Sequence, residues 1–143
     1  MNKDAIKNVV RIISLRLLGL FLFLVMLFLL SILNDTVDYP LLDSIVQFLN
    51  NNVYLIIYMT FIFLFGELFT LQKFPLNLPG PLVNAAGSLL VVTFVLRVFD
   101  LVDSMIGENV FHIFDQLSFV IYTVVFTIVL IAGYITIFIR EIR

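Results

Sequence analysis

The chain has 143 residues, of which 62% are hydrophobic and 13% are charged, and its formal net charge is −2. A water-soluble domain of this size could not bury so much apolar surface, so the composition excludes an ordinary soluble protein. The absence of cysteine excludes disulfides, thiolate metal sites and thiol nucleophiles.

Four long apolar segments predict an all-α, polytopic membrane protein with a single four-helix transmembrane domain. The spans are expected over about residues 12–33, 53–73, 81–100 and 117–139. Each is long enough, or nearly so, to cross a hydrocarbon layer of roughly 30 Å. The first span is too long for the apolar part of a signal peptide, and no small-x-small cleavage pattern follows it. We therefore expect it to stay attached.

Residues 3–16 form a basic lead-in to the first span. Lys3, Lys7 and Arg11 fall on one helical face, and apolar residues fall on another. Two interpretations are equally open. The segment lies on anionic headgroups as an amphipathic helix, or it extends the first span and its charges act in topogenesis.

Two short amphipathic helices are predicted on the outer side, over about residues 40–51 and 103–115. In the first, apolar residues recur at helical spacing after Pro40, a residue suited to the first helical turn. The asparagines at 50–52 are expected to end this helix. The second helix repeats the pattern, although Gly107 weakens it. Both are expected to lie on the outer leaflet.

Positive and negative charges are separated along the chain. Lysine and arginine occur before the first span, between the second and third, and after the fourth, at Lys3, Lys7, Arg11, Arg16, Lys73, Arg140 and Arg143. The other two loops are acidic. Because Lys and Arg near span ends are retained in the cytoplasm, the N and C termini are both predicted to be cytoplasmic. Arg97, at the outer end of the third span, is the exception.

A polar layer is predicted within the inner third of the membrane. Its members are Arg16, Glu67, Asn84, Ser88 and Tyr134. An ionisable group in the bilayer is costly unless it is paired, so Glu67 is a functional hypothesis by default. It is either a proton- or cation-handling site with Arg16 as its partner, or half of an Arg16–Glu67 strut that fixes helix register. We favour the strut. A third option is that Glu67 reaches the inner headgroups.

An outer charged cluster is predicted around Arg97. Its members are Arg97, Asp100, Asp103, Asp35, His112 and Asp115. Asp100 lies one turn after Arg97 on the same face. A functional cluster would attract cations to the external mouth, whereas a structural one would neutralise a positive charge on the outer side. The structural interpretation is preferred.

The chain resembles the phosphate-starvation-inducible E family of small prokaryotic membrane proteins. The resemblance is carried by Phe65-Gly66-Glu67, by the inner turn from Phe74-Pro75 to Pro81, and by Phe94-Val95-Leu96-Arg97-Val98-Phe99-Asp100. It implies a four-helix protein of the prokaryotic inner (plasma) membrane with a stress- or phosphate-related role, in a family without an established biochemical activity. Residues 76–80 depart from the aromatic and basic turn of the family, which argues against a ligand role for that loop.

The leading functional prediction is a non-enzymatic integral membrane protein that works through helix–helix association. It would be a homo-oligomer or a small subunit of a membrane complex, with the lipid bilayer and other membrane chains as partners and no nucleic acid or cofactor. Gly19, Gly66, Gly133 and the small residues at 84–88 suit close helix packing. The alternative is a small oligomeric ion channel or proton-coupled transporter in which Glu67 lines the path. No catalytic, cofactor or metal motif points to an enzyme.

Overall fold

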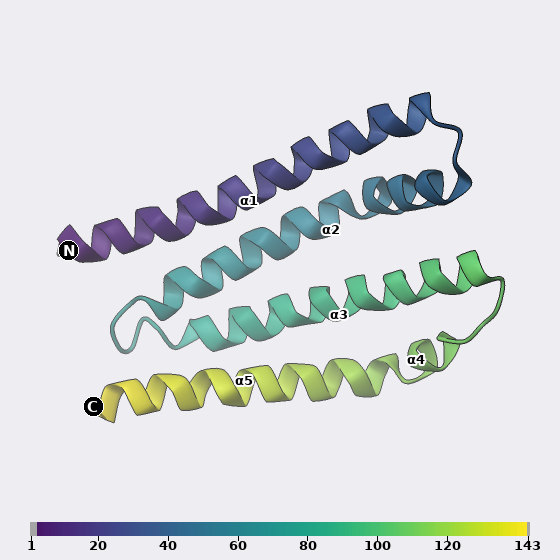
Figure 1. Cartoon of the computed structure of the whole chain (residues 1–143). Coiled ribbons are helices and arrows are strands. Elements are labelled where there is room, and N and C mark those ends of the chain that lie inside the picture. The colour runs from purple at the N-terminus through teal and green to yellow at the C-terminus, as the bar shows by residue number, and fades with distance from the viewer. Residues whose placement is uncertain (1–2, 143) are drawn as a thin grey trace.

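The computed structural model describes residues 3–142, which form helices and no strand. The helices are α1 (Lys3–Thr36), α2 (Pro40–Thr70), α3 (Pro79–Ile106), α4 (His112–Gln116) and α5 (Ser118–Ile142). All but α4 are long and apolar enough to cross a membrane. This confirms the predicted all-helical class with four candidate spans. The start of α1 and the end of α5 lie at the same end of the molecule (Figure 1).

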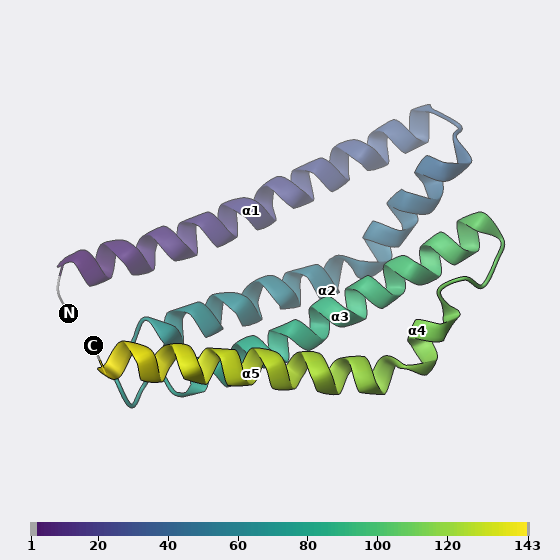
Figure 2. The same ribbon diagram turned by 60° about the horizontal axis from the view of Figure 1, so that its bottom comes forward.

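The four long helices lie side by side in chain order, as an open row (Figure 1). α3 packs against α2 on one side and against α5 on the other, whereas the main contacts of α1 are with α2. Figure 2 shows that α1 and α5 stay apart at opposite ends of the row. Within one chain, the helices therefore do not close around a central axis.

Most large apolar side chains point away from the row. The few that are buried are Leu27, Val46, Leu64, Ala85, Val92, Leu96 and Ile137. Leucine, isoleucine, valine and phenylalanine side chains are exposed along all four long helices. Apolar patches of this extent are rare on soluble monomers. They match a solvent of lipid, in which helices satisfy their own backbone groups and turn apolar side chains outward.

Small residues bring the middle helices close together. A Cβ atom added to Gly66 of α2 would overlap Oδ1 of Asn84 on α3. On the other face of α3, a Cβ added to Gly133 of α5 would lie 2.7 Å from Cβ of Pro81. These contacts confirm the predicted role of Gly66 and Gly133 in close packing. Gly19 of α1 differs, because a Cβ there would meet nothing within 4 Å.

The first predicted outer helix is not a separate element. α2 continues without a break from Pro40 through residues 50–52, so the predicted helix end at the asparagines is wrong. The side-chain amide of Asn52 donates a hydrogen bond of 2.8 Å to the carbonyl of Phe48, one turn back in the same helix. Back-bonding of this kind is compatible with a helix and tends to bend it. Figure 2 shows α2 bent in its outer part.

The second predicted outer helix, over residues 103–115, is also wrong in its boundaries. α3 ends at Ile106, Gly107 follows in the left-handed region (φ 74°), and α4 contains only five residues. Asp103 is buried, and its carboxylate accepts the backbone N–H groups of Val110 and Phe111 at 3.0–3.1 Å. The carboxylate thus holds a capped loop where the pattern predicted a surface helix.

The inner connection between α2 and α3 is short and ordered, as its prolines predict. The amide of Leu76 donates to the carbonyl of Lys73 (2.9 Å), and the amide of Leu78 donates to that of Pro75 (3.2 Å). Arg140 near the end of α5 donates a 3.0 Å hydrogen bond to the carbonyl of Thr70. A cation therefore caps the C-terminal end of α2, where helix carbonyls lack partners.

Candidate functional site

An ion pair joins α1 to α2 in the half of the row that contains the start of α1 and the end of α2. Arg16 Nε donates to Oε2 of Glu67 at 3.3 Å, and Arg16 Nη2 contacts Oε1 of the same carboxylate. The residues of α1 that are at least half-buried include a series spaced at intervals of three and four: Val9, Ile13, Arg16, Leu20, Phe23, Leu27, Leu30 and Asn34. This repeat is typical of one helix packed lengthwise on another. It places Arg16 on the face that meets α2.

The ion pair is only partly covered by its own chain. The side chains of Arg16 and Glu67 keep 40% and 35% of their surface exposed. Gly19 lies one turn after Arg16 and leaves open space beside it. Polar groups on a candidate span normally face the protein interior, because lipid does not solvate them. The α1–α2 edge therefore carries charges that a single chain leaves half-exposed.

The other predicted members of the inner layer do not join this ion pair in one cluster. Asn84 packs against Gly66, the residue before Glu67, and its Oδ1 is buried without a hydrogen-bond partner. The hydroxyl of Ser88 donates to the carbonyl of Ala85 in its own helix at 2.6 Å. Tyr134 is half-buried on α5, at the far end of the row from α1. Of the predicted layer, only Arg16 and Glu67 contact each other, and the Asn84 amide oxygen near them has no hydrogen-bond partner.

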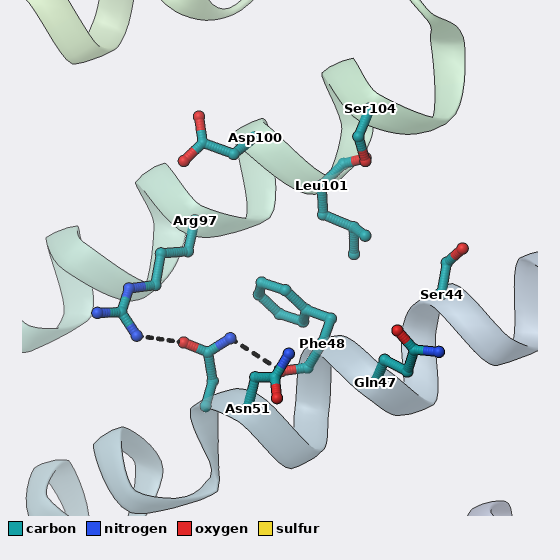
Figure 3. A pocket seen from close by; sticks show the side chains of 9 residues that line it. Ser44, Gln47, Phe48, Asn51, Arg97, Asp100, Leu101 and Ser104 are labelled. Carbon is teal, nitrogen blue, oxygen red and sulfur yellow. Dashed lines mark hydrogen bonds between the residues drawn. The ribbon is translucent and has the colours of Figure 1, made fainter.

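Arg97 does not pair with the acidic residues predicted around it. Its Nη1 donates a 2.6 Å hydrogen bond to Oδ1 of Asn52, a side chain of α2 that is only 4% exposed. Figure 3 shows the Arg97 guanidinium directed toward α2 and the Asp100 carboxylate turned away from it. The expected neutralisation by Asp100 is wrong, because a buried amide across the helix interface binds the guanidinium instead.

Four members of the predicted outer cluster lie close together without Arg97, since the Asp100 carboxylate faces that of Asp115 and has Asp103 and His112 nearby. Asp103 caps the loop after α3. Nδ1 of His112 lies 3.9 Å from Oδ2 of Asp115, three residues later. Asp35 is exposed in the last turn of α1. Asp100, Asp103, His112 and Asp115 therefore come together as predicted, whereas Arg97 bonds to Asn52 instead of joining them.

Two partly buried side-chain hydrogen bonds between helices were not predicted from the sequence. One is the Arg97–Asn52 hydrogen bond, because the sequence pattern assigns the asparagines at 50–52 to a helix end. The other joins the hydroxyl groups of Thr93 on α3 and Tyr122 on α5, 2.7 Å apart. The available signal was the presence of Asn, Thr and Tyr beside or within apolar spans, where such groups seek partners on neighbouring helices.

A cavity of about 440 Å³ opens between the outer parts of α2 and α3 (Figure 3). It is lined by Ser44, Gln47, Phe48, Asn51 and Asn52 of α2 and by Arg97, Asp100, Leu101 and Ser104 of α3. The lining combines one cation, one anion, three amides and two hydroxyl groups with two apolar side chains. This cavity and the Arg16–Glu67 edge are the two candidate sites.

The fold and the distribution of apolar surface place the chain among multi-pass helical membrane proteins. Comparisons with protein-family models, curated proteins and solved structures find no match to the chain. The resemblance to the phosphate-starvation-inducible E family therefore stays a prediction.

Proposed function

We propose that this protein is a non-enzymatic integral membrane protein that acts through helix–helix assembly, as a homo-oligomer or as a small subunit of a membrane complex. The observation that carries the proposal is the half-exposed Arg16–Glu67 ion pair at the α1–α2 edge of the row. In the proposed topology, the charge distribution places both termini in the cytoplasm and this edge in the inner half of the membrane.

The first argument is the cost of leaving these charges exposed. A charged residue at the centre of a membrane helix costs about 2.5–3.5 kcal/mol on insertion scales, and the cost falls toward the interface. Arg16 and Glu67 already neutralise each other, yet more than a third of each side chain stays uncovered. A helix from a second chain would supply the cover that α3 and α5 cannot give from the other side of α2.

The second argument is the shape of the same edge. α1 has its main contacts with α2 alone, and Gly19 lies open one turn from Arg16. Glycine on a membrane helix lets another helix backbone approach closely, which increases van der Waals contact in the absence of a hydrophobic driving force. Open space and uncovered polar groups therefore coincide on one edge.

The test is the mass of the assembly in a lipid bilayer. Single-molecule photobleaching in nanodiscs should show more than one copy per particle for the wild-type homo-oligomer. Gly19→Ile should reduce the copy number, because the side chain fills the open space at the edge. Ala132→Ile, on an exposed position of α5, is the matched control and should leave the copy number unchanged. A wild-type protein that is monomeric and co-purifies with no other membrane chain would contradict the proposal.

The same preparation separates assembly from transport. Glu67→Gln removes the negative charge and keeps the shape of the side chain. Under the assembly proposal, wild type and variant give no ion flux in proteoliposomes, and the variant assembles less well. A wild-type flux that disappears in Glu67→Gln while the copy number is unchanged would replace this proposal with the channel or transporter alternative.

A further inference from the structure

The cavity between α2 and α3 contains a cation that has no acidic partner. Arg97 Nη1 donates to Oδ1 of Asn52, which is a neutral group. The Asp100 carboxylate, one turn later on α3, is turned away from α2 (Figure 3) and faces Asp115 of α4. Among the side chains of residues 6–142, no carboxylate forms an ion pair with Arg97. The positive charge is therefore held in position without being neutralised by contact.

Asn52 fixes the direction in which the guanidinium points. Its amide nitrogen donates to the carbonyl of Phe48, which orients its oxygen toward Arg97 (dashed lines in Figure 3). A guanidinium carries five N–H donors in a rigid fork, and the hydrogen bond to Asn52 uses one of them. Arg97 and Asn51 are both exposed and line the cavity. This end of the cavity therefore offers N–H donors to an oxyanion.

The other end of the cavity offers neutral acceptors. The amide nitrogen of Gln47 donates to Oδ2 of Asp43 at 2.9 Å, which leaves the amide oxygen of Gln47 directed toward α3 (Figure 3). The carboxylate of Asp43 lies outside the lining, and its Oδ1 accepts from Asn34. The hydroxyl groups of Ser44 and Ser104 donate to carbonyls of the preceding turn in their own helices, at 3.0 and 2.7 Å. Their oxygens keep lone pairs for an incoming donor.

The order of donors and acceptors along the helices matches that of a lipid headgroup. α2 and α3 run in opposite directions (Figure 1), so in the proposed topology Arg97 lies about two helical turns, roughly 10 Å, deeper in the membrane than Ser44 and Ser104. In a phospholipid the phosphate lies deeper than the alcohol esterified to it. A phosphate at Arg97 therefore places that alcohol beside the serines. Neutral acceptors suit the hydroxyl groups of an alcohol better than an ammonium, because an ammonium that leaves water needs a counter-charge.

We infer that the cavity between α2 and α3 binds a glycerol phosphodiester, the headgroup of phosphatidylglycerol. Arg97 and Asn51 donate to the phosphate oxygens, since a guanidinium fork matches phosphate geometry. The glycerol hydroxyl groups donate to Ser44, Gln47 and Ser104. The single negative charge of this headgroup matches the single cation that faces the cavity. The volume of about 440 Å³ accommodates such a group.

The first experiment measures which lipid the protein retains. The detergent-solubilised wild-type protein is mixed with equal amounts of phosphatidylglycerol, phosphatidylethanolamine and phosphatidylcholine, and the bound lipid is read by native mass spectrometry. We expect selective retention of phosphatidylglycerol. Arg97→Gln should reduce that retention by about tenfold, as loss of a charge-assisted hydrogen bond would do. Lys73→Gln, which removes an exposed cation from the connection between α2 and α3, is the control and should retain the lipid.

A second variant neutralises Arg97 without removing it. Asn52→Asp keeps an oxygen acceptor beside the guanidinium and supplies the carboxylate that the cavity lacks. It should reduce retention of phosphatidylglycerol by about tenfold or more, because the guanidinium then has an anionic partner of its own. Equal retention of the three lipids by wild type, or retention of phosphatidylglycerol at the wild-type level by both Arg97→Gln and Asn52→Asp, would overturn the inference.

A matched lipid tests the contacts of the glycerol. Phosphatidylethanol carries the same phosphodiester charge, but its alcohol has no free hydroxyl group. Wild type should retain phosphatidylglycerol about threefold more strongly, the effect of a neutral hydrogen bond. The double variant Ser44→Ala, Ser104→Ala should lose this preference and still retain phosphatidylethanol. Equal retention of the two lipids by wild type would contradict recognition of the glycerol.

Calorimetry then distinguishes a lipid from a soluble diester. Glycerophosphoglycerol, the same headgroup without acyl chains, is titrated into protein held in nanodiscs of phosphatidylcholine alone. Binding that is lost in Arg97→Gln supports the site and assigns it to a free diester as well as to a lipid. Lipid selectivity without binding of glycerophosphoglycerol supports the site and assigns it to the membrane. Absence of both effects would contradict the inference. A monomeric protein that selectively retains phosphatidylglycerol would contradict the assembly proposal and support this site.

Discussion

Arg16 on α1 donates to the carboxylate of Glu67 on α2, 51 residues later in the chain, and links the outermost helix of the row to its neighbour. Among the side chains that the structure describes, those of residues 6–142, it is the only ion pair between two long helices. The pair sets the register of α1 along α2, because sliding by one residue would rotate Arg16 off the shared face. The side chains of the same pair stay partly exposed in a single chain.

Exchanging Arg16 and Glu67 should preserve most of the stability of the protein, whereas removing either charge alone should reduce it. Arg16→Gln and Glu67→Gln should each lower the free energy of unfolding by about 1–3 kcal/mol, between the values of exposed and buried pairs, because each leaves one uncompensated charge. The double variant Arg16→Glu, Glu67→Arg should recover most of this loss. Unfolding in mixed micelles with increasing SDS measures the effect. Failure of the exchange to restore stability would show that the two side chains do not act as a pair.

The three glycines on the packing faces should respond differently to the same added methyl group. Gly133→Ala places Cβ 2.7 Å from Cβ of Pro81, a rigid ring that cannot move aside. We expect a loss of about 1–3 kcal/mol, the usual cost of overpacking. Gly66→Ala should also destabilise, through its overlap with Asn84. Gly19→Ala, which meets open space within its own chain, is the matched control. At a protein concentration where each micelle holds a single chain, it should not lower the free energy of unfolding.

Asp103 should protect the backbone of the loop that follows α3. In Asp103→Ala the amides of Val110 and Phe111 lose their acceptor. Their hydrogen exchange should become about tenfold faster or more, since hydrogen bonds to a charged group contribute about 1.5–3 kcal/mol. Asp115→Ala is the control, because the acceptor of both amides is the carboxylate of Asp103 and not that of Asp115. Unchanged exchange in Asp103→Ala would contradict the proposed cap.

The topology should place both termini in one compartment. Fusions of green fluorescent protein to either terminus should be fluorescent, and fusions of alkaline phosphatase to either terminus should be inactive, as expected for cytoplasmic ends. Phosphatase inserted in the loop at 107–110 should be active. Reporters that place the two ends in different compartments would contradict an even number of spans.

The sequence was sufficient to predict the long helices and the pairing of Arg16 with Glu67. The length of the apolar segments predicts the long helices, because a helix can satisfy all of its own backbone hydrogen bonds in lipid. The pairing follows from two opposite charges at similar depth, which leaves little choice of partner.

The helix structure around Asn52 and Asp103 could not be predicted from the sequence, because tertiary contacts determine it. Asn52 fits inside α2 by bonding to Phe48 and Arg97, contacts that only the neighbouring turn and α3 provide. The sequence pattern puts Asp103 on the polar face of a predicted surface helix. In the structure Asp103 is buried, and its carboxylate accepts a hydrogen bond from the loop that follows α3. Local propensity is overridden at both positions.

The half-exposed edge of α1 and α2 is most directly tested by cross-linking in the native membrane. The chain contains no cysteine, so a single cysteine reports one position. In a symmetric dimer, an edge that packs on its own copy brings equivalent residues together. Gly19→Cys should therefore give a disulfide-linked dimer under mild oxidation, whereas Ile128→Cys, at an exposed position of α5, should stay monomeric. Cross-linking of Ile128→Cys with none at Gly19→Cys would contradict assembly through the edge that carries Arg16 and Glu67.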